Sequence, residues 1–99
     1  MTATVVRYQA KPDRADENQE LIEAVFADLG ARRPVGFTYQ VFRLEDGVSF
    51  VHVVVEDDGV EHPDALTDVP AFQAFVHDIG DRCDVPPQVA GATLVGGYR

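Results

Sequence analysis

The sequence contains no tryptophan, one cysteine and one serine, and acidic residues outnumber basic ones. The single cysteine, Cys83, excludes an intrachain disulfide, and no CxxC or Cys/His spacing indicates zinc. The only serine, Ser49, lacks the GxSxG surroundings of a hydrolase nucleophile. With 8 Lys and Arg against 17 Asp and Glu, the formal charge is −9, and no basic cluster is present to neutralise a phosphate backbone. These absences exclude a disulfide scaffold, a serine hydrolase and a nucleic-acid partner.

Long apolar runs are also missing. No stretch approaches the roughly 18–20 apolar residues that a membrane span needs, and the first residues lack the basic start and apolar run of a signal peptide. We therefore expect a cytoplasmic protein with no membrane partner. The 99 residues are 45% hydrophobic and 25% charged, which is typical of one globular domain over residues 1–99.

The first third of the chain predicts a strand and then a helix. Residues 4–10 are rich in β-branched and aromatic side chains and end before Pro12. Apolar residues then recur at spacings of three and four over residues 13–29, which predicts an amphipathic helix. We expect Asp13 to cap this helix and Gly30 to end it.

The middle of the chain predicts a β-hairpin. Residues 36–44 and 48–55 follow a period of two and flank the dipeptide Asp46-Gly47, a strong hairpin signal. The second arm is apolar on both faces, which is typical of a central strand. An acidic segment, residues 56–66, is broken by glycine and proline and predicts a solvated loop rather than a metal site.

A second helix and a last strand complete the pattern. Residues 69–80 carry one apolar stripe, with Asp68 or Thr67 as its cap and Gly80 at its end, and residues 88–98 read as a small-residue edge strand. The order is β-α-β-β-α-β, a ferredoxin-like α+β fold in which both helices cover one face of a four-stranded antiparallel sheet. Because the strand at 48–55 is apolar on both faces, the second face also needs cover. We expect a homodimer formed through the open sheet faces.

A possible site follows from the hairpin register. If Asp46-Gly47 forms a two-residue turn, residues pair so that their numbers sum to 93, and Tyr39, Arg43 and His52 share one face. A change of one residue in loop length separates His52 from the other two. Three polar groups on an apolar wall are typical of a small-molecule pocket.

Each of these residues has a chemical and a structural interpretation. His52 is suited to act as a base, Arg43 to hold an anionic or enolate oxygen, and Tyr39 to donate a hydrogen bond. The structural alternative makes His52 an interior hydrogen-bonded histidine, Tyr39 a core or interface aromatic, and Arg43 an ion-pair partner of Glu45 or of a second subunit. Further candidates on the neighbouring first strand are Arg7 and Tyr8.

Three segments carry a family resemblance. Arg7–Asp13 leading into Glu20–Ile22, then Pro34–Arg43, then Phe72–Val76 resemble the dimeric α+β barrel superfamily, especially antibiotic-biosynthesis-monooxygenase-like proteins. The resemblance covers nearly the whole chain. It implies two sheets packed into a barrel, a small pocket between sheet and helices, and relatives that include cofactor-independent oxygenases of aromatic substrates and haem-degrading enzymes.

Some features of that family are missing here. The haem-degrading members resemble one another in an Asn–Trp–His set, whereas this chain has no tryptophan and its only asparagine, Asn18, falls in the first predicted helix. His77 lies near the place of that set's histidine but off the apolar stripe, so we expect it to face solvent. The resemblance implies a cofactor-independent monooxygenase-like protein, without metal or cofactor, for a small aromatic or polyketide-like compound. The alternative is a non-catalytic homodimeric module for small-molecule binding or assembly.

Overall fold

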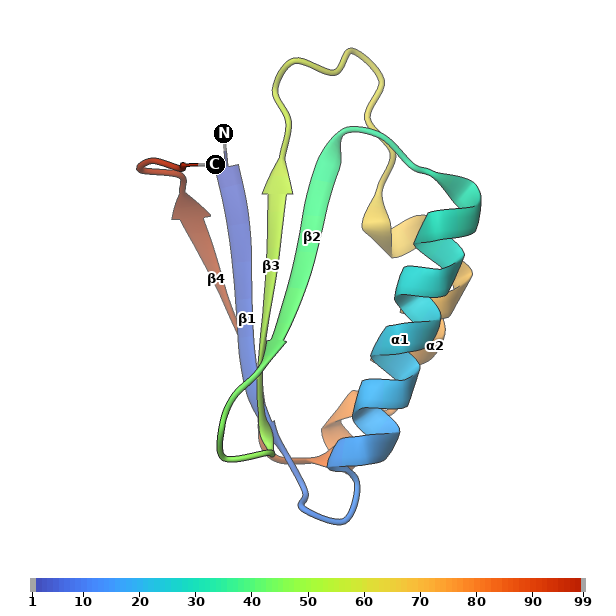
Figure 1. Ribbon diagram of the computed structural model, residues 1–99, viewed down its shortest axis with the longest axis vertical. Helices are drawn as coiled ribbons and strands as arrows, with labels where there is room; N and C mark the ends of the chain where they lie inside the picture. Colours follow the sequence, from blue (N-terminus) through green and yellow to red (C-terminus); the bar gives the residue numbers. More distant parts are fainter. Residues whose placement is uncertain (1, 99) are drawn as a thin grey trace.

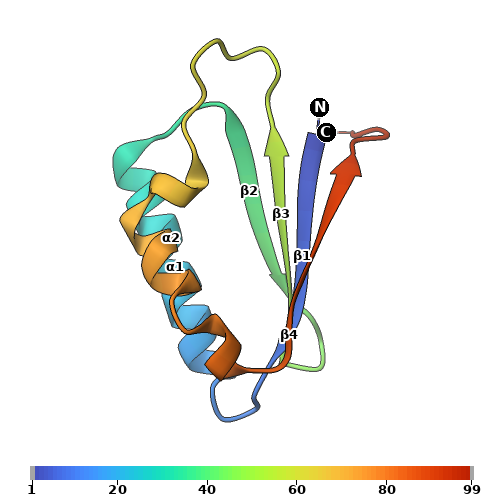
Figure 2. The same cartoon turned by 180° about the vertical axis from the view of Figure 1, so that it is seen from behind.

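The computed structural model describes residues 2–98 and shows one antiparallel sheet with helices on one of its faces (Figures 1 and 2). The four strands lie in the order β2-β3-β1-β4, so β3 and β1 are central and β2 and β4 are edges. This confirms the predicted fold class. The elements, in chain order, are β1 (Thr2–Ala10), α1 (Ala15–Arg32), β2 (Phe37–Arg43), β3 (Ser49–Glu56), η1 (Leu66–Asp68), α2 (Pro70–Val76), η2 (Ile79–Arg82) and β4 (Cys83–Thr93).

The hairpin has the predicted register. Val41 pairs with His52, Arg43 with Phe50 and Tyr39 with Val54, as the sum of 93 requires. The connection is longer than the two-residue turn, because β2 ends at Arg43 and β3 begins at Ser49. The Asp46 carboxylate explains the longer loop: it accepts hydrogen bonds from the amides of Val48 and Ser49, which fixes the chain in a local turn.

Helix α1 differs from the prediction at both ends. Its N-cap is Arg14 rather than Asp13, with no side-chain hydrogen bond to the helix amides. The helix continues through Gly30 and ends at Arg32, where Arg33 adopts a left-handed conformation (φ 52°) and its amide donates to the Leu29 carbonyl at 2.8 Å. Gly30 has a continuous helix on both sides, so the predicted stop there is wrong.

The second helix is shorter than predicted and splits in two. Helix α2 begins at Pro70 with Val69 as its N-cap, so the caps expected at Asp68 or Thr67 are wrong. It ends at Val76, because His77 leaves the helical conformation and Asp78 takes a left-handed one (φ 60°). The remaining residues up to Arg82 form the 3-10 turn η2. Residues 69–80 are therefore not one helix, and this break brings Arg82 into the interior.

Strand β4 runs over Cys83–Thr93, earlier than the predicted 88–98, and includes Pro86 and Pro87. Its position beside β1 alone confirms the predicted edge strand and explains why prolines are tolerated, since only one side of β4 needs amide donors. The pairing with β1 is irregular near Arg7 and Gln9. Cys83, at the start of the strand, is buried with a free thiol.

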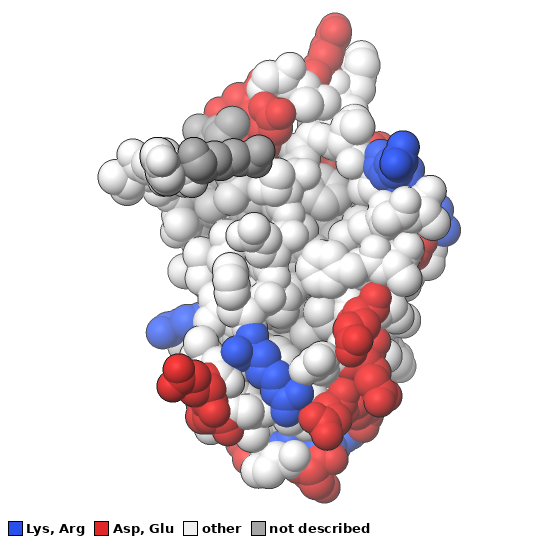
Figure 3. All heavy atoms as spheres, in the orientation of Figure 1, with Lys and Arg blue, Asp and Glu red and all other residues white. Residues whose placement is uncertain are grey.

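The two faces of the sheet differ in cover. On the helix side Phe50, Phe75 and Val25 are almost completely buried. On the other side no helix lies over the sheet (Figures 1 and 2). Phe42 is 51% exposed there and Leu44 48%. Uncharged surface fills the centre of the view in Figure 3, and acidic side chains gather over the lower part of α1. Within residues 2–98, no helix is both long and apolar enough to cross a membrane.

Candidate functional site

A row of five polar side chains lies between the sheet and the helices, and each comes from a different element. We call this row the polar array. Four of its members are at most 4% exposed, and the fifth, on the edge strand β2, is partly buried. Its members, in the order of their hydrogen bonds, are Arg82 of η2, Asn18 of α1, Tyr8 of β1, His52 of β3 and Tyr39 of β2.

His52 is held from both sides. Its Nε2 atom lies 2.7 Å from the Tyr8 hydroxyl, and its Nδ1 atom lies 2.7 Å from the Tyr39 hydroxyl. The side chain reaches this position because β3 is central and alternates, so that Phe50, His52 and Val54 face the helices. Both ring nitrogens of the buried imidazole therefore have a partner, as a buried polar group requires.

The other end of the polar array is anchored by a buried cation. The Arg82 guanidinium donates from Nε to Asn18 Oδ1 at 3.3 Å, and its other nitrogens donate to the carbonyls of His77 and Phe75. Those carbonyls lie at the C-terminal end of α2, where the helix dipole is negative and favours a positive charge. The Asn18 amide nitrogen in turn donates to the Tyr8 hydroxyl at 2.8 Å.

Aromatic rings surround the imidazole. His52 stacks on Phe75 with ring centroids 5.2 Å apart, and Tyr39 stacks on Phe26 at 5.1 Å with Phe72 at its edge at 6.2 Å. This apolar setting excludes water from the array and strengthens the hydrogen bonds inside it.

Burial also determines the protonation states. Desolvation lowers the pKa of His52 from 6.5 to about 4, and it raises the pKa of the Tyr8 and Tyr39 hydroxyls above their usual range. Near neutral pH the imidazole and both phenols are thus uncharged. The array is then a set of neutral groups that ends in one permanent cation, Arg82.

The hairpin candidates divide into two groups. Tyr39 and His52 come together, whereas Arg43 lies at the end of β2 and turns to α1. Its guanidinium donates to Asp16 at 3.1 Å, to Gln19 at 2.7 Å and to a loop carbonyl. It is also 5.5 Å from the centroid of the Phe50 ring. Within residues 2–98 no hydrogen bond, ion pair or ring contact joins Arg43 to His52, and the ion pair of Arg43 is with Asp16, not with Glu45.

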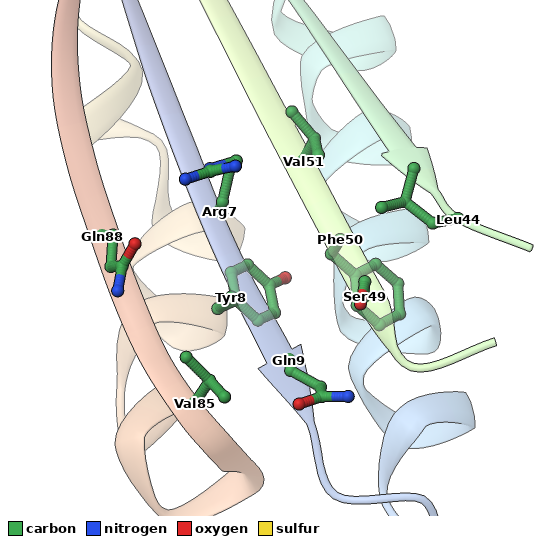
Figure 4. A pocket seen from close by; sticks show the side chains of 9 residues that line it. All are labelled: Arg7, Tyr8, Gln9, Leu44, Ser49, Phe50, Val51, Val85 and Gln88. Atoms are coloured by element: carbon green, nitrogen blue, oxygen red, sulfur yellow. The ribbon is translucent and has the colours of Figure 1, made fainter. Parts of the chain in front are cut away.

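The two first-strand candidates point in opposite directions. Tyr8 joins the array, while Arg7 points away from the helices (Figure 4). Arg7 lines a shallow cavity of about 270 Å³ on the open face. His52 and Tyr39 do not line that cavity; its lining is Arg7, Tyr8, Gln9, Leu44, Ser49, Phe50, Val51, Val85 and Gln88.

Two array members were not assigned a role from the sequence. The hairpin register relates only residues of β2 and β3. Asn18 lies on α1 and Arg82 on η2, so the register does not predict where they pack against the sheet. The available signals were an asparagine in the apolar-facing part of a helix and an arginine directly before a strand. His77 is exposed, as predicted, and contacts Asp78 at 3.2 Å. Among the described residues no group of three or more His, Cys, Asp or Glu side chains is arranged to hold a metal ion.

Comparisons with known proteins match the structure rather than the sequence. No protein-family model matches the chain, and no curated protein matches its sequence. Solved structures do match over nearly the full length. The structure of Rv0793 from Mycobacterium tuberculosis superposes with a TM-score of 0.74 at 17% identity, covering 99% of this chain and 98% of that one.

Two further solved structures carry functional names. One, described as an antibiotic biosynthesis monooxygenase, has a TM-score of 0.71 at 18% identity and covers 97% of this chain and 100% of its own. The other is a variant of SnoaB, a cofactor-independent oxygenase from Streptomyces nogalater. It has a TM-score of 0.67 at 18% identity and covers 97% of this chain and 94% of its own. At these identities the likeness concerns the backbone, and it confirms the resemblance inferred from the sequence at that level: the chain has the fold of the antibiotic-biosynthesis-monooxygenase-like structures.

Proposed function

We propose that the protein is a cofactor-independent monooxygenase-like enzyme for a small aromatic or polyketide-like compound. The observation that carries this proposal is the Tyr8–His52–Tyr39 arrangement, a neutral imidazole between two phenols in an aromatic environment. It lies between sheet and helices in a fold that SnoaB, a cofactor-independent oxygenase, also has. Aromatic walls suit a flat ligand, and a few convergent polar groups orient it.

In the proposed reaction Tyr39 contacts the substrate, because it is the least buried member of the array. An electron-rich phenol bound as its anion is stabilised by a hydrogen bond from the Tyr39 hydroxyl to the anionic oxygen. The anion transfers electrons to dioxygen and forms a carbon–oxygen bond at a ring carbon that carries hydrogen, and the resulting peroxide anion takes a proton from water. The hydroperoxide then loses the ring hydrogen and its outer O–H as water, which leaves one oxygen atom on the product as a carbonyl; the proton given up when the phenol ionised balances the one taken up by the peroxide. His52 orients Tyr39 here, since both of its nitrogens already have partners.

Oxygen consumption tests the proposal. Wild-type protein is mixed with a panel of electron-rich phenols in an oxygen electrode, together with Tyr39→Phe and His52→Ala. The exposed Tyr98→Phe and His77→Ala provide matched controls that remove the same groups elsewhere. We expect turnover in wild type and both controls, a loss of about a hundredfold in Tyr39→Phe, as for removal of one oxyanion donor, and a loss in His52→Ala because Tyr39 is no longer oriented. Equal rates in all five proteins would contradict the assignment of the site.

A non-catalytic binding module is the second candidate. It is favoured by one observation: neither nitrogen of His52 is free to accept a proton from a ligand. In that case aromatic ligands raise the thermal unfolding temperature of the wild type, and do so less for Tyr39→Phe, while oxygen uptake stays at the level of buffer for every phenol. Turnover by the wild type would eliminate this candidate.

In either case we propose that the protein acts as a homodimer whose subunits pack through the open sheet faces. Val5, Val51 and Val53 line the middle of that face, and Phe42 and Leu44 extend it at one edge. An exposed surface that is apolar apart from Arg7, which pairs with Val51 on the same face, is typical of an association surface. A second copy buries the same residues on both sides, which is the usual symmetry of a dimer.

Solution mass at micromolar concentration tests the assembly. Light scattering is expected to give twice the mass of the 99-residue chain for wild type and a monomer for Phe42→Asp, because the substitution places a charge in the proposed contact. Val95→Asp, at a residue 99% exposed on the C-terminal segment, is the matched control. A monomeric wild type would contradict the proposal.

A further inference from the structure

The hydrogen bonds of the polar array have a direction that can be worked out from its cationic end. Arg82 is only a donor, because a guanidinium carries five N–H groups, has no acceptor and stays protonated. Its Nε–H lies 3.3 Å from the side chain of Asn18, so the atom of Asn18 that faces it is the carbonyl oxygen Oδ1. The amide nitrogen Nδ2 then faces Tyr8, and Asn18 donates to the Tyr8 hydroxyl at 2.8 Å.

The hydroxyl of Tyr8 must therefore donate its own hydrogen bond to its other neighbour. It accepts from Asn18, and its other hydrogen-bond partner is His52 Nε2 at 2.7 Å. If Nε2 carried the imidazole proton, the Tyr8 oxygen would face two donors, and its own O–H would have no acceptor in a residue 4% exposed. A buried unpaired donor is costly, so the Tyr8 O–H donates to Nε2. The imidazole proton is left on Nδ1.

The direction continues to the edge strand. Nδ1–H of His52 donates to the Tyr39 oxygen at 2.7 Å, which leaves the Tyr39 O–H as the last donor in the row. Within residues 2–98 this hydroxyl has no second hydrogen-bond partner, and Tyr39 is partly exposed. Every earlier proton in the row is committed to a neighbour, so Tyr39 is the member that meets a ligand, and it does so as a donor.

The geometry points to Asn18, held by Arg82, as a positioning residue that fixes His52 as the Nδ1–H tautomer and makes Tyr39 a hydrogen-bond donor to the oxygen of a phenolate or related oxyanion. The tautomer is a property of the ligand-free protein. The ligand class rests on the proposed function, since it places the ligand at Tyr39. Neighbouring hydrogen bonds in such a row polarise one another, and the cation at its start favours negative charge at its end.

The tautomer is measured directly by two-bond ¹⁵N–¹H correlation spectroscopy of the ¹⁵N-labelled protein near neutral pH. His52→Gln identifies the signals of His52. We expect wild-type His52 to have a protonated Nδ1 and an unprotonated Nε2, the reverse of the form favoured by free histidine in water. A protonated Nε2 in the wild-type spectrum would by itself overturn the proposal, and this test needs no variant of an array residue other than the one that assigns the signals.

Asn18→Asp is expected to reverse the direction of the hydrogen bonds from Tyr8 to Tyr39 in the polar array. A carboxylate at position 18 accepts from Arg82 and from the Tyr8 O–H, because it has no hydrogen to donate. The Tyr8 oxygen then accepts from Nε2–H of His52, and the Tyr39 O–H turns inward to Nδ1. Gln19→Glu adds the same charge at the next, exposed residue of α1 and serves as the matched control. We expect Nε2–H in Asn18→Asp and Nδ1–H in Gln19→Glu; an unchanged tautomer in folded Asn18→Asp would refute the role of Asn18.

The ligand class is tested with para-nitrophenol, whose phenolate is coloured. A donor site binds the phenolate in preference to the phenol, so wild-type protein is expected to lower the pH at which the bound probe ionises. Asn18→Asp and Tyr39→Phe are expected to bind the phenolate about tenfold more weakly or worse, the loss of one hydrogen bond to a charged group. Gln19→Glu is expected to bind as wild type does. Equal phenolate affinity in all variants would refute the ligand class, and absent oxygen uptake beside tight binding would refute only the proposed reaction.

Discussion

Acidification is expected to destabilise the protein through His52 before its carboxylates are protonated. The folded protein keeps the imidazole neutral, with a pKa of about 4, whereas the same side chain in the unfolded chain has a pKa of 6.5. Below pH 6.5 the unfolded state therefore binds more protons than the folded state. Stability is complete above pH 6.5 and falls as the pH approaches 4, because proton uptake favours unfolding.

The size of this effect follows from the two pKa values of His52. Linkage predicts a loss of about 2 kcal/mol between pH 7.5 and pH 5, approaching about 3 kcal/mol below pH 4. Because the measurements stop at pH 5, the change in the free energy of unfolding comes from His52 and not from the carboxylates. Neighbouring basic or hydroxyl groups lower the pKa of Glu17, Asp28 and Asp46 in the folded protein, and the stability that these carboxylates contribute is lost only as the pH falls through their unfolded pKa values of 4.5, 3.8 and 3.8, below this window.

Urea unfolding followed by far-ultraviolet circular dichroism measures the loss, which suits a chain without tryptophan. The free energy of unfolding is compared at pH 7.5, 6.5, 5.5 and 5 at one protein concentration. His52→Gln is expected to be less stable but nearly independent of pH over this range, and the exposed His77→Gln is expected to follow the wild type. A wild-type stability that is flat down to pH 5, or a slope that survives in His52→Gln, would refute the reasoning.

Two further pairs of substitutions follow from the structure. Tyr8→Phe leaves two buried atoms, His52 Nε2 and Asn18 Nδ2, without their partner and is expected to cost about 2–4 kcal/mol. Tyr39→Phe leaves only His52 Nδ1 without its partner and is expected to cost about half as much, about 1–2 kcal/mol. Urea midpoints compare the two, and the reverse order would contradict the array. Gly30→Ala is expected to stabilise α1 by about 0.5–1 kcal/mol, since the added methyl group meets nothing within 4 Å. Gly36→Ala is expected to destabilise by at least about 1 kcal/mol, because φ is +102° and the new Cβ would lie 2.7 Å from Pro63 Cα. Thermal unfolding distinguishes these opposite signs.

The fold was predictable because its signals are local. The apolar residues on both faces of residues 48–55 marked β3 as central, and the Asp46-Gly47 dipeptide placed the hairpin, so the pairing of Val41 with His52 could be derived from the sequence. The longer loop kept the same sum of residue numbers, and the faces were therefore unchanged.

Element ends were less predictable because competing signals decide them. Gly30 is compatible with a helix stop and with a helix interior, and the helix continues two residues past it, to where the Arg33 amide donates to the Leu29 carbonyl. The second helix broke at Asp78, whose left-handed conformation has no reliable sequence signal. That break could not be read from the apolar stripe at 69–80, and it is what places Arg82 in the interior.

The candidate site was predictable only within the hairpin. Register placed Tyr39, Arg43 and His52 on one face, but it does not determine where a long side chain turns, and Arg43 reaches the acidic start of α1 instead. Asn18 and Arg82 join the array through tertiary packing between elements far apart in sequence. Contacts of this kind have no characteristic spacing in the sequence, so a sequence pattern cannot predict them.

The composition of the polar array also has a consequence for folding. Its hydrogen bonds join residues 44 and 64 positions apart, and its five members come from five different elements. Contacts between distant residues form late, after the entropy of closing long loops has been overcome. A partly folded molecule, even one with α1 and the hairpin in place, still lacks its anchor from η2. The His52 resonance is thus expected to report the complete native state, because its environment depends on all five elements.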